Sequence, residues 1–361
     1  MDTTVFSPDY CTARAKFRQA LAPPNFRHEA FEIEQVAPTG EALTIDVAIS
    51  PCEQPREIVV ISSGLHGVEG FLGSAVQVAW LNQLQFWQSL PTTTQVILIH
   101  ALNPYGFAWR RRWNEDNIDL NRNFLLPGDR YAGRAAQYDQ IRAFFNPQSP
   151  PSRPDFFNLE ALALVARYGY AALRKTLPVG QYDYPRDLFF GGQAPAKTQD
   201  ILVTHLARWI GTASRVIHLD FHSGLGRSGT YTLLISDTQA SARYQRLRQQ
   251  FPGDPIYTTD QAQRTYVIRG GIGLWCQTQL PNCQYDYLTV EFGTYPPRQV
   301  LRALRAENRA HWWGQPGCNY DWTKQQLVEI FAPRDLTWRS RCLQQGVDLC
   351  HRACQTSRSS A

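Results

Sequence analysis

The sequence lacks the segments that carry a chain into or across a membrane. Its N-terminus, MDTTVFSPDYCTARAKF, has no basic start followed by an apolar run, so it does not resemble a secretory signal peptide. No stretch approaches the roughly 20 apolar residues that are needed to span a bilayer. We therefore expect a cytoplasmic protein with no membrane partner.

A large excess of either charge is also absent. The 36 Lys and Arg residues and the 31 Asp and Glu residues leave a net charge of +5 over 361 residues. That imbalance is mild for this length and does not indicate nucleic acid as a partner. The eight cysteines are an even number, as disulfides would require, but without a secretory signal we expect mostly free thiols in a reducing cytosol.

Two short motifs are too incomplete to define a ligand site. The segment GLGRSG (224–229) lacks the GK[ST] of a nucleotide loop and opens no clear helix, so we expect a flexible turn at the rim of a site. The segment CHRAC (350–354) fits no common zinc spacing. Because cysteine is among the most buried residue types, we expect structural cysteines there.

Short apolar runs alternate with helical patterns along the chain. Strands are predicted at residues 42–50, 57–63, 95–102, 215–222, 230–236 and 287–294. Apolar residues recur at helical spacing within residues 73–87, between the second and third of these runs. This βαβ unit predicts an α/β protein with three layers, α/β/α, around a mixed and mostly parallel central sheet.

The sequence is read as one catalytic domain over residues 1–361. An insertion is predicted at about 127–200, because this stretch combines a proline-rich loop, an amphipathic helix at 158–175 and an aromatic, glycine-rich loop. A helical C-terminal extension is predicted at about 320–358. The last residues are expected to fray.

Residues of the kind that bind metals follow two of the predicted strands. His66 and Glu69 lie in GLHGVEG directly after one strand, and His222 ends another in VIHLDFHSG. In open α/β sheets, functional groups gather beyond the carboxyl ends of strands, and catalytic zinc commonly takes three such ligands. An ordinary loop histidine and a capping glutamate remain the alternative for His66 and Glu69. Alternation places Asp220 on the face of His222, where it can orient the imidazole.

A glutamate and several arginines complete the set of candidate residues. Glu291 stands between apolar residues in TVEFG, where partial burial would raise its pKa and suit it to act as a general base. The alternative is an edge glutamate in a salt bridge. The segment NPYGFAWRRRWNEDNIDLNRNF (103–124) is rich in arginine, and guanidinium groups in a pocket indicate a substrate carboxylate.

Taken together, these motifs resemble the zinc carboxypeptidase and deacylase superfamily. They occur in the expected order over roughly residues 56–300. The first motif is His66-x-x-Glu69, and the second is Asn103-Pro-x-Gly106, which leads to Arg112-x-Asn114 and Asp119-Leu-Asn-Arg-Asn-Phe124. The third is His222-Ser223-Gly224, and the fourth is Glu291. The loop YDYPRDLFFGG (182–192) resembles a feature of a carboxypeptidase-like branch that is related to the succinylglutamate desuccinylase and aspartoacylase type.

The resemblance implies a role for each matched residue. One Zn²⁺ would be held by His66, Glu69 and His222. Glu291 would activate the attacking water and pass its proton to the leaving amine, and Arg112 would stabilise the oxyanion.

The resemblance further implies that Asn121 and Arg122 grip the substrate carboxylate. For Arg122, a pair with Asp119 or another local acid is the alternative. The family also uses a tyrosine near that carboxylate. Tyr266 precedes Glu291 at a suitable distance, although an ordinary loop tyrosine is the competing interpretation.

The expected function is therefore a zinc-dependent hydrolase that cleaves an amide bond in a small molecule or short peptide bearing a carboxylate. Two subtypes fit equally: a carboxypeptidase, or a deacylase that acts on N-acyl amino acids. The alternative to an enzyme is a binding protein that holds zinc but catalyses no reaction. The oligomeric state is left open by the sequence.

Overall fold

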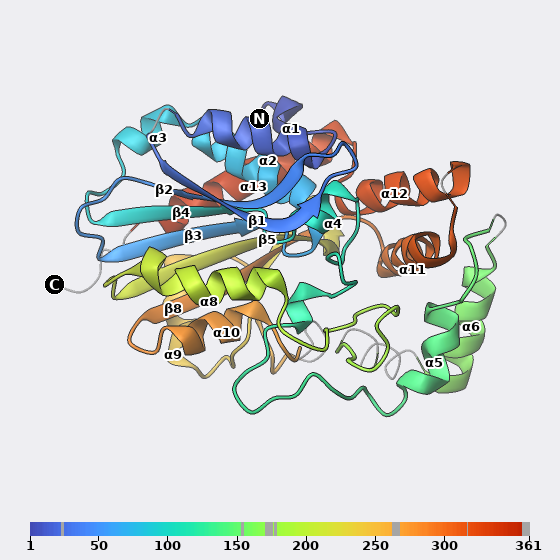
Figure 1. Cartoon of the computed structure of the whole chain (residues 1–361). Coiled ribbons are helices and arrows are strands. Elements are labelled where there is room, and N and C mark those ends of the chain that lie inside the picture. Colours follow the sequence, from blue (N-terminus) through green and yellow to red (C-terminus); the bar gives the residue numbers. More distant parts are fainter. Residues whose placement is uncertain are drawn as a thin grey trace.

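The computed structural model describes residues 1–22, 25–152, 155–169, 176, 179–261, 268–315 and 317–355 (Figure 1). The strands are β1 (Arg27–Val36), β2 (Ala42–Ile49), β3 (Glu57–Ser63), β4 (Thr94–His100), β5 (Arg215–Ser228), β6 (Tyr231–Ile235), β7 (Ile256–Thr258) and β8 (Gln284–Gly293). The described helices include α1 (Tyr10–Ala20), α2 (Gly70–Leu81), α8 (Lys197–Ile210), α9 (Ala242–Gln250), α10 (Ile272–Gln279), α11 (Pro297–Trp313), α12 (Cys318–Phe331) and α13 (Leu336–Ala353). The remaining helices are α3 (Leu84–Gln88), α4 (Pro104–Ala108), α5 (Tyr138–Phe145) and α6 (Phe157–Tyr168), with 3-10 turns η1 (Thr3–Val5), η2 (Gly67–Glu69) and η3 (Leu120–Arg122).

The eight strands form one mixed sheet in the order β1-β2-β4-β3-β5-β8-β6-β7. The central pairs β4–β3, β3–β5 and β5–β8 are parallel, whereas β1–β2, β2–β4 and β6–β8 are antiparallel. The central strands β3 and β4 are mostly apolar and buried along almost their whole length, and β5 is buried from Val216 to Gly224, as expected for strands that are covered on both faces.

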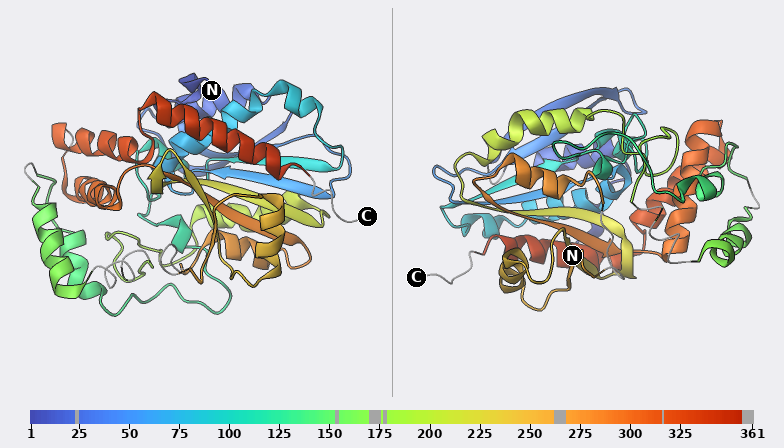
Figure 2. Two further views of the ribbon diagram at one scale, coloured as in Figure 1. Left: turned by 180° about the vertical axis from the view of Figure 1, so that it is seen from behind. Right: turned by 90° about the horizontal axis from the view of Figure 1, so that it is seen from below.

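Helices cover both faces of this sheet. Figures 1 and 2 show α1, α2 and α13 on one face and α8 and α10 on the other. Apolar side chains of α2 and α13 join strand residues in one buried cluster, and those of α8 and α10 join strand residues in a second cluster. The predicted three-layer α/β/α architecture with a mixed, mostly parallel sheet is therefore confirmed.

Besides the short strand β7, which the sequence did not predict, two stretches differ from the predicted strands. The edge strand β1 was not predicted, because Ile33 is its one buried residue and charged side chains interrupt its apolar residues. The segment 224–229, expected as a flexible turn, lies largely within β5, which continues to Ser228 after an irregularity in its pairing with β8. In both places pairing with a neighbouring strand decides the backbone conformation.

Four helices lie beyond the carboxyl ends of the parallel strands. Figure 1 shows α11 and α12 on this side, with α5 and α6 next to α11. The predicted insertion contains α5 and α6, and it ends close to Lys197, where α8 begins. The helix expected at 158–175 is present as α6 and ends at Tyr168, while residues 170–175 lie outside the described part.

The described cysteines agree with the expectation of free thiols. Seven of them, at positions 11, 52, 276, 283, 342, 350 and 354, are free. Cys350 and Cys354 are buried on α13 within the apolar cluster shared with α2, and the ring of His351 stacks on Phe86. This segment therefore packs as core, as predicted.

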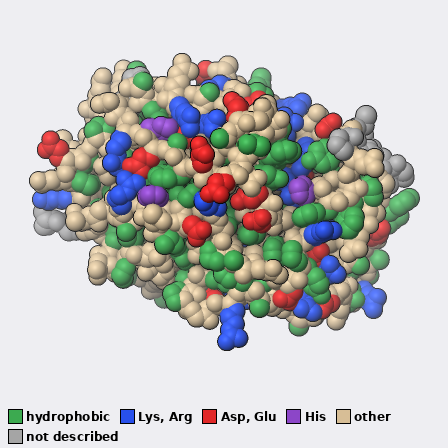
Figure 3. All heavy atoms as spheres, in the orientation of Figure 1, with side chains coloured by type: hydrophobic (Ala, Val, Ile, Leu, Met, Phe, Trp, Pro, Cys, Tyr) green, Lys and Arg blue, Asp and Glu red, His purple; other side chains and the backbone are tan. Residues whose placement is uncertain are grey.

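The surface and the helices add two observations. Figure 3 shows positive and negative side chains interspersed over the visible face, as the small net charge leads one to expect. Within the described ranges, no helix has both the length and the apolar character needed to cross a bilayer.

Candidate metal centre

His66 and Glu69 are placed by a tight turn that follows β3. Gly64 has a φ of +65°, which favours glycine, and carries the chain out of the strand. A Cβ on Gly67 would lie 2.1 Å from the carbonyl carbon of Gly106, so η2 can approach α4 this closely only without a side chain. The glycines around His66 therefore serve to press the turn against α4.

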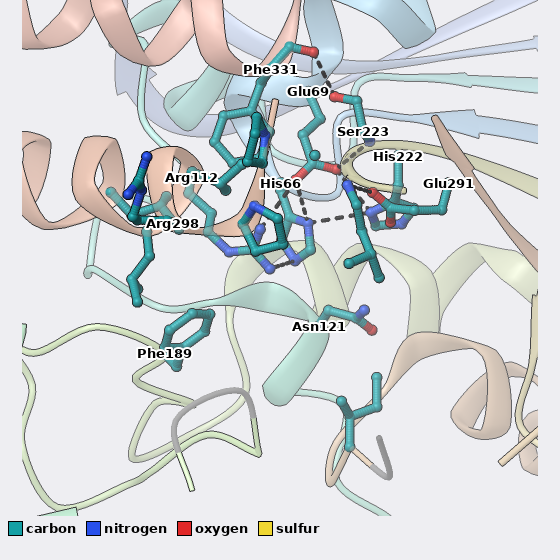
Figure 4. A pocket seen from close by; sticks show the side chains of 18 of the residues that line it. His66, Glu69, Arg112, Asn121, Phe189, His222, Ser223, Glu291, Arg298 and Phe331 are labelled. Carbon is teal, nitrogen blue, oxygen red and sulfur yellow. Dashed lines mark hydrogen bonds and ion pairs between the residues drawn. The ribbon is translucent and has the colours of Figure 1, made fainter. Parts of the chain in front are cut away.

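His222 and Glu291 are brought together by strand pairing. They are register partners on the parallel strands β5 and β8, although 69 residues separate them in the sequence. Because residues at one register position of neighbouring strands share a face, both side chains reach the same end of the sheet. Figure 4 shows Glu291 beside His222, with His66 and Glu69 opposite.

The three predicted ligands converge in the structure. Nδ1 of His66 lies 3.0 Å from Glu69 Oε1, Nδ1 of His222 lies 3.0 Å from Glu69 Oε2, and the two Nδ1 atoms are 3.2 Å apart. All three residues are buried, and among the described residues they are the one group of three or more His, Cys, Asp or Glu that could hold a metal ion.

Each imidazole turns its other nitrogen toward a buried carboxylate. Nε2 of His222 lies 2.6 Å from Asp220 Oδ2, and Nε2 of His66 lies 3.1 Å from Asp119 Oδ1. Carboxylates placed in this way fix the ring orientation and raise the basicity of the nitrogen that faces the metal. The donor set and its supporting carboxylates therefore fit a divalent cation such as Zn²⁺.

Asp220 was predicted to orient His222, and its contacts agree. Its oxygens also accept hydrogen bonds from Ser62 Oγ (2.5 Å) and Tyr287 Oη (2.7 Å). His218 lies on the same strand but bonds Ser62 and Tyr285 instead, so it belongs to the core. The role of Asp119 was missed, because nothing in the sequence pairs it with a histidine 53 residues away.

We expect Asp220→Asn to weaken zinc binding by about 10- to 100-fold, because the amide carries no charge to support the imidazole of His222. Competition against a chromophoric chelator measures the zinc affinity. The control is Asp46→Asn, another buried aspartate in the sheet that contacts Arg18 and His28 far from the cluster. Equal zinc affinity in Asp220→Asn and wild type would rule out the positioning role.

The histidines and carboxylates of the cluster shift one another's pKa values. Burial alone would lower the pKa of His222, but the carboxylates of Asp220 and Glu69 outweigh it and raise that pKa well above its ordinary value. Burial would likewise raise the pKa of Glu69, but His66 and His222 lower it. The buried carboxylates thus favour positive charge at this place, and a bound cation would supply it in place of a proton on His222.

Arg112 reaches the cluster from the segment after α4. Its Nη1 donates to Glu69 Oε1 (3.1 Å), its Nε donates to Asp119 Oδ2 (3.1 Å), and its guanidinium lies over the ring of Phe189. The structure therefore puts this arginine within reach of any group bound at the three ligands.

Glu291 is a buried carboxyl group next to the three ligands. Its Oε1 accepts the N–H of Leu225 (2.9 Å), and it takes no part in the group of three ligands. Burial, together with the negative charge of Glu69, raises its pKa to about 8. A carboxylate with a raised pKa takes a proton from water more readily than an exposed one.

Of the two residues predicted to bind the substrate carboxylate, one lines the cavity next to the three ligands and the other does not. Asn121 lines it, whereas Arg122 is 1% exposed and does not. The Nη1 of Arg122 donates to Asn121 O (2.9 Å) and lies 3.9 Å from Asp119 Oδ1. Tyr266, the candidate tyrosine, lies outside the described residues.

A cavity of about 690 Å³ opens onto the cluster. Its polar end includes His66, Glu69, His222, Glu291 and Arg112. Apolar side chains of α5, α6 and α11 line another part, with Phe189 from the aromatic loop and Phe331 at the end of α12. The strands β6 and β8 and nearby segments add both apolar and polar residues, namely Leu234, Ile235, Ser236, Thr259, Tyr287 and Thr289. A volume in this range is typical of pockets that bury a small molecule.

Sequence comparison gives a family match. The model of a family described as "Protein of unknown function (DUF2817)" matches residues 6–345. No curated protein matches the sequence.

Comparison of structures gives several distant likenesses. Carboxypeptidase A from Helicoverpa armigera is 14% identical over 96% of this chain and 73% of that chain, with a TM-score of 0.45. Metallo-carboxypeptidase from Burkholderia cenocepacia is 12% identical over 93% and 67%, with a TM-score of 0.41. Murein-tripeptide amidase MpaA from Escherichia coli O157 is 19% identical over 81% and 93%, with a TM-score of 0.40.

Proposed function

The chain belongs to the DUF2817 family, and we propose that it is a zinc-dependent hydrolase that cleaves an amide bond in a small substrate bearing a carboxylate. The observation that carries the proposal is the convergence of three buried ligand side chains next to Glu291 at the end of a cavity. Zn²⁺ held by this triad would polarise the scissile carbonyl and lower the pKa of a water molecule.

The chain's own residues supply the remaining chemistry. Leu225 holds Oε1 of Glu291, so Oε2 is the oxygen that takes the proton from the attacking water and returns it to the leaving amine. The guanidinium of Arg112 stabilises the oxyanion that develops on the carbonyl, as other preorganised donors do. The side chain of Asn121, which lines the same cavity, is available to the substrate carboxylate.

A hydrolysis screen tests the proposal. Zinc-loaded protein is incubated with N-acyl amino acids and short peptides, with Glu291→Gln as the blank. Release of free amino acid by the wild type alone would support a hydrolase, and the class that is cleaved decides between deacylase and carboxypeptidase. Zinc and substrate binding without turnover would instead establish a binding protein.

Two arginines are expected to differ in their kinetic effects. Because Arg122 is buried and does not line the cavity, we expect Arg122→Lys to leave KM nearly unchanged. A rise in KM of about tenfold would show instead that Arg122 anchors the substrate carboxylate, because an ammonium cannot replace the bidentate fork. Arg112→Lys lowers kcat about 100-fold, because its target charge develops only in the transition state. Steady-state kinetics with free-acid and amidated substrates measures both effects.

Arg298 supplies the comparison for this prediction. Among the described residues, Arg298 and Arg112 are the arginines that line the cavity, and Arg298 is exposed at the start of α11. A raised KM for acids in Arg298→Lys, with an unchanged KM in Arg122→Lys, would assign the carboxylate to Arg298. Arg122 would then serve Asp119 and the fold.

A further inference from the structure

The charged side chains of the cavity are concentrated at the end that contains His66, Glu69 and His222. Three helices supply an apolar wall that leads away from it: Phe144 and Phe145 end α5, Leu162 and Val165 lie on α6, and Leu301 and Leu304 lie on α11. Within the described lining, Asn158 is the one polar side chain from α5 and α6, and Arg298 is the one charged side chain from α11.

This wall is poorly suited to a peptide. An extended peptide would bury N–H and C=O groups that need hydrogen-bond partners. On these helices only Asn158 and Arg298 could supply them, because Ser236, Thr259 and Thr289 belong to other parts of the lining. A short acyl group such as acetyl would leave most of the 690 Å³ cavity unfilled. An aliphatic chain gains from the same wall, because burial of apolar surface is the main source of its binding free energy.

We propose that the substrate is an N-acyl amino acid whose acyl group is an aliphatic chain of about eight or more carbons. The proposal rests on the proposed function, since it places the amide carbonyl at the three ligands and Arg112. The chain then lies between α5, α6 and α11.

The outer part of the wall is open to solvent. Leu162 lines the cavity, and yet 67% of it is exposed. Val165, one helical turn further along α6, is 36% exposed and also lines the cavity. A bound acyl chain would cover both side chains, which accounts for apolar residues at positions that otherwise face water.

Helix α6 also provides a matched control. Leu159 is the same residue type on the same helix and is likewise 67% exposed, but it does not line the cavity. Because both leucines are exposed, glutamine at either position is expected to leave the fold intact.

The experiment measures binding and not turnover. Isothermal titration calorimetry is performed on the zinc-loaded full chain carrying Glu291→Gln, with acetyl, butanoyl, hexanoyl and octanoyl derivatives of one amino acid below their micelle concentrations. We expect Kd to fall about three- to fourfold with each added methylene. Adding Leu162→Gln should lower the ratio of octanoyl to acetyl affinity about fivefold, whereas Leu159→Gln should keep the ratio of the parent.

Each outcome decides the proposal. Affinity that does not vary with acyl length would overturn it. An equal loss in Leu162→Gln and Leu159→Gln would also overturn it, because it would reveal a general surface effect. Hydrolysis of acetyl amino acids with no dependence on chain length would leave the proposed hydrolase standing without this substrate class. Length-dependent binding with no turnover by the wild type would support the acyl site and overturn the hydrolase.

Discussion

Glu291→Gln is expected to lower kcat by about 10³- to 10⁴-fold while zinc remains bound. The glutamine oxygen can still accept the N–H of Leu225, so the local structure is kept, whereas the basic oxygen is lost. General-base catalysis by a positioned carboxylate contributes roughly two to four decades in rate. Single-turnover kinetics on the zinc-loaded proteins measures the loss, and elemental analysis measures the metal.

Glu115→Gln is the control for Glu291→Gln. Burial raises the pKa of Glu115 to about 6, but this residue does not line the cavity. Glu115→Gln should therefore keep the activity of the wild type. Loss of zinc from Glu291→Gln would show that Glu291 is a ligand, and retained activity would show that it is not the base.

His222→Asn is expected to reduce bound zinc from one ion per chain to almost none and to abolish turnover. The substitution removes one of three ligands and leaves Asp220 without its imidazole partner. At a zinc concentration of about 100 Kd, binding to the folded state should stabilise the wild type by about 2.7 kcal/mol, or roughly 3 to 4 °C in Tm. The variant should show no such shift.

His218→Asn is the matched control for this variant. His218 lies on the same strand and is equally buried, and its hydrogen bonds go to Ser62 and Tyr285 and not to any of the three ligands. It should lose stability but keep zinc and the zinc-dependent rise in Tm. A zinc-dependent rise in Tm that persists in His222→Asn would refute the assignment of this histidine as a ligand.

Residue type and local spacing were enough to predict much of the fold and the triad. The apolar runs at 57–63 and 215–222 predicted β3 and the first part of β5, because strands buried on both faces need continuous apolar sequence. His66, Glu69 and His222 could be chosen because each follows or ends such a strand. Their convergence confirms that parallel strands bring their carboxyl ends to one edge of the sheet.

Tertiary structure decided what local sequence does not contain. Strand register placed Glu291 beside His222, and chain reversal placed Asp119 behind His66. Packing also buried Arg122 against Gly180 and away from the cavity, while α5, α6 and α11 formed its apolar wall. The sequence by itself determined which side chains can act at this site, because their chemistry and their strand ends are local properties. Only the tertiary structure decided which of them meet and what surrounds them, because both depend on contacts between segments distant in the chain.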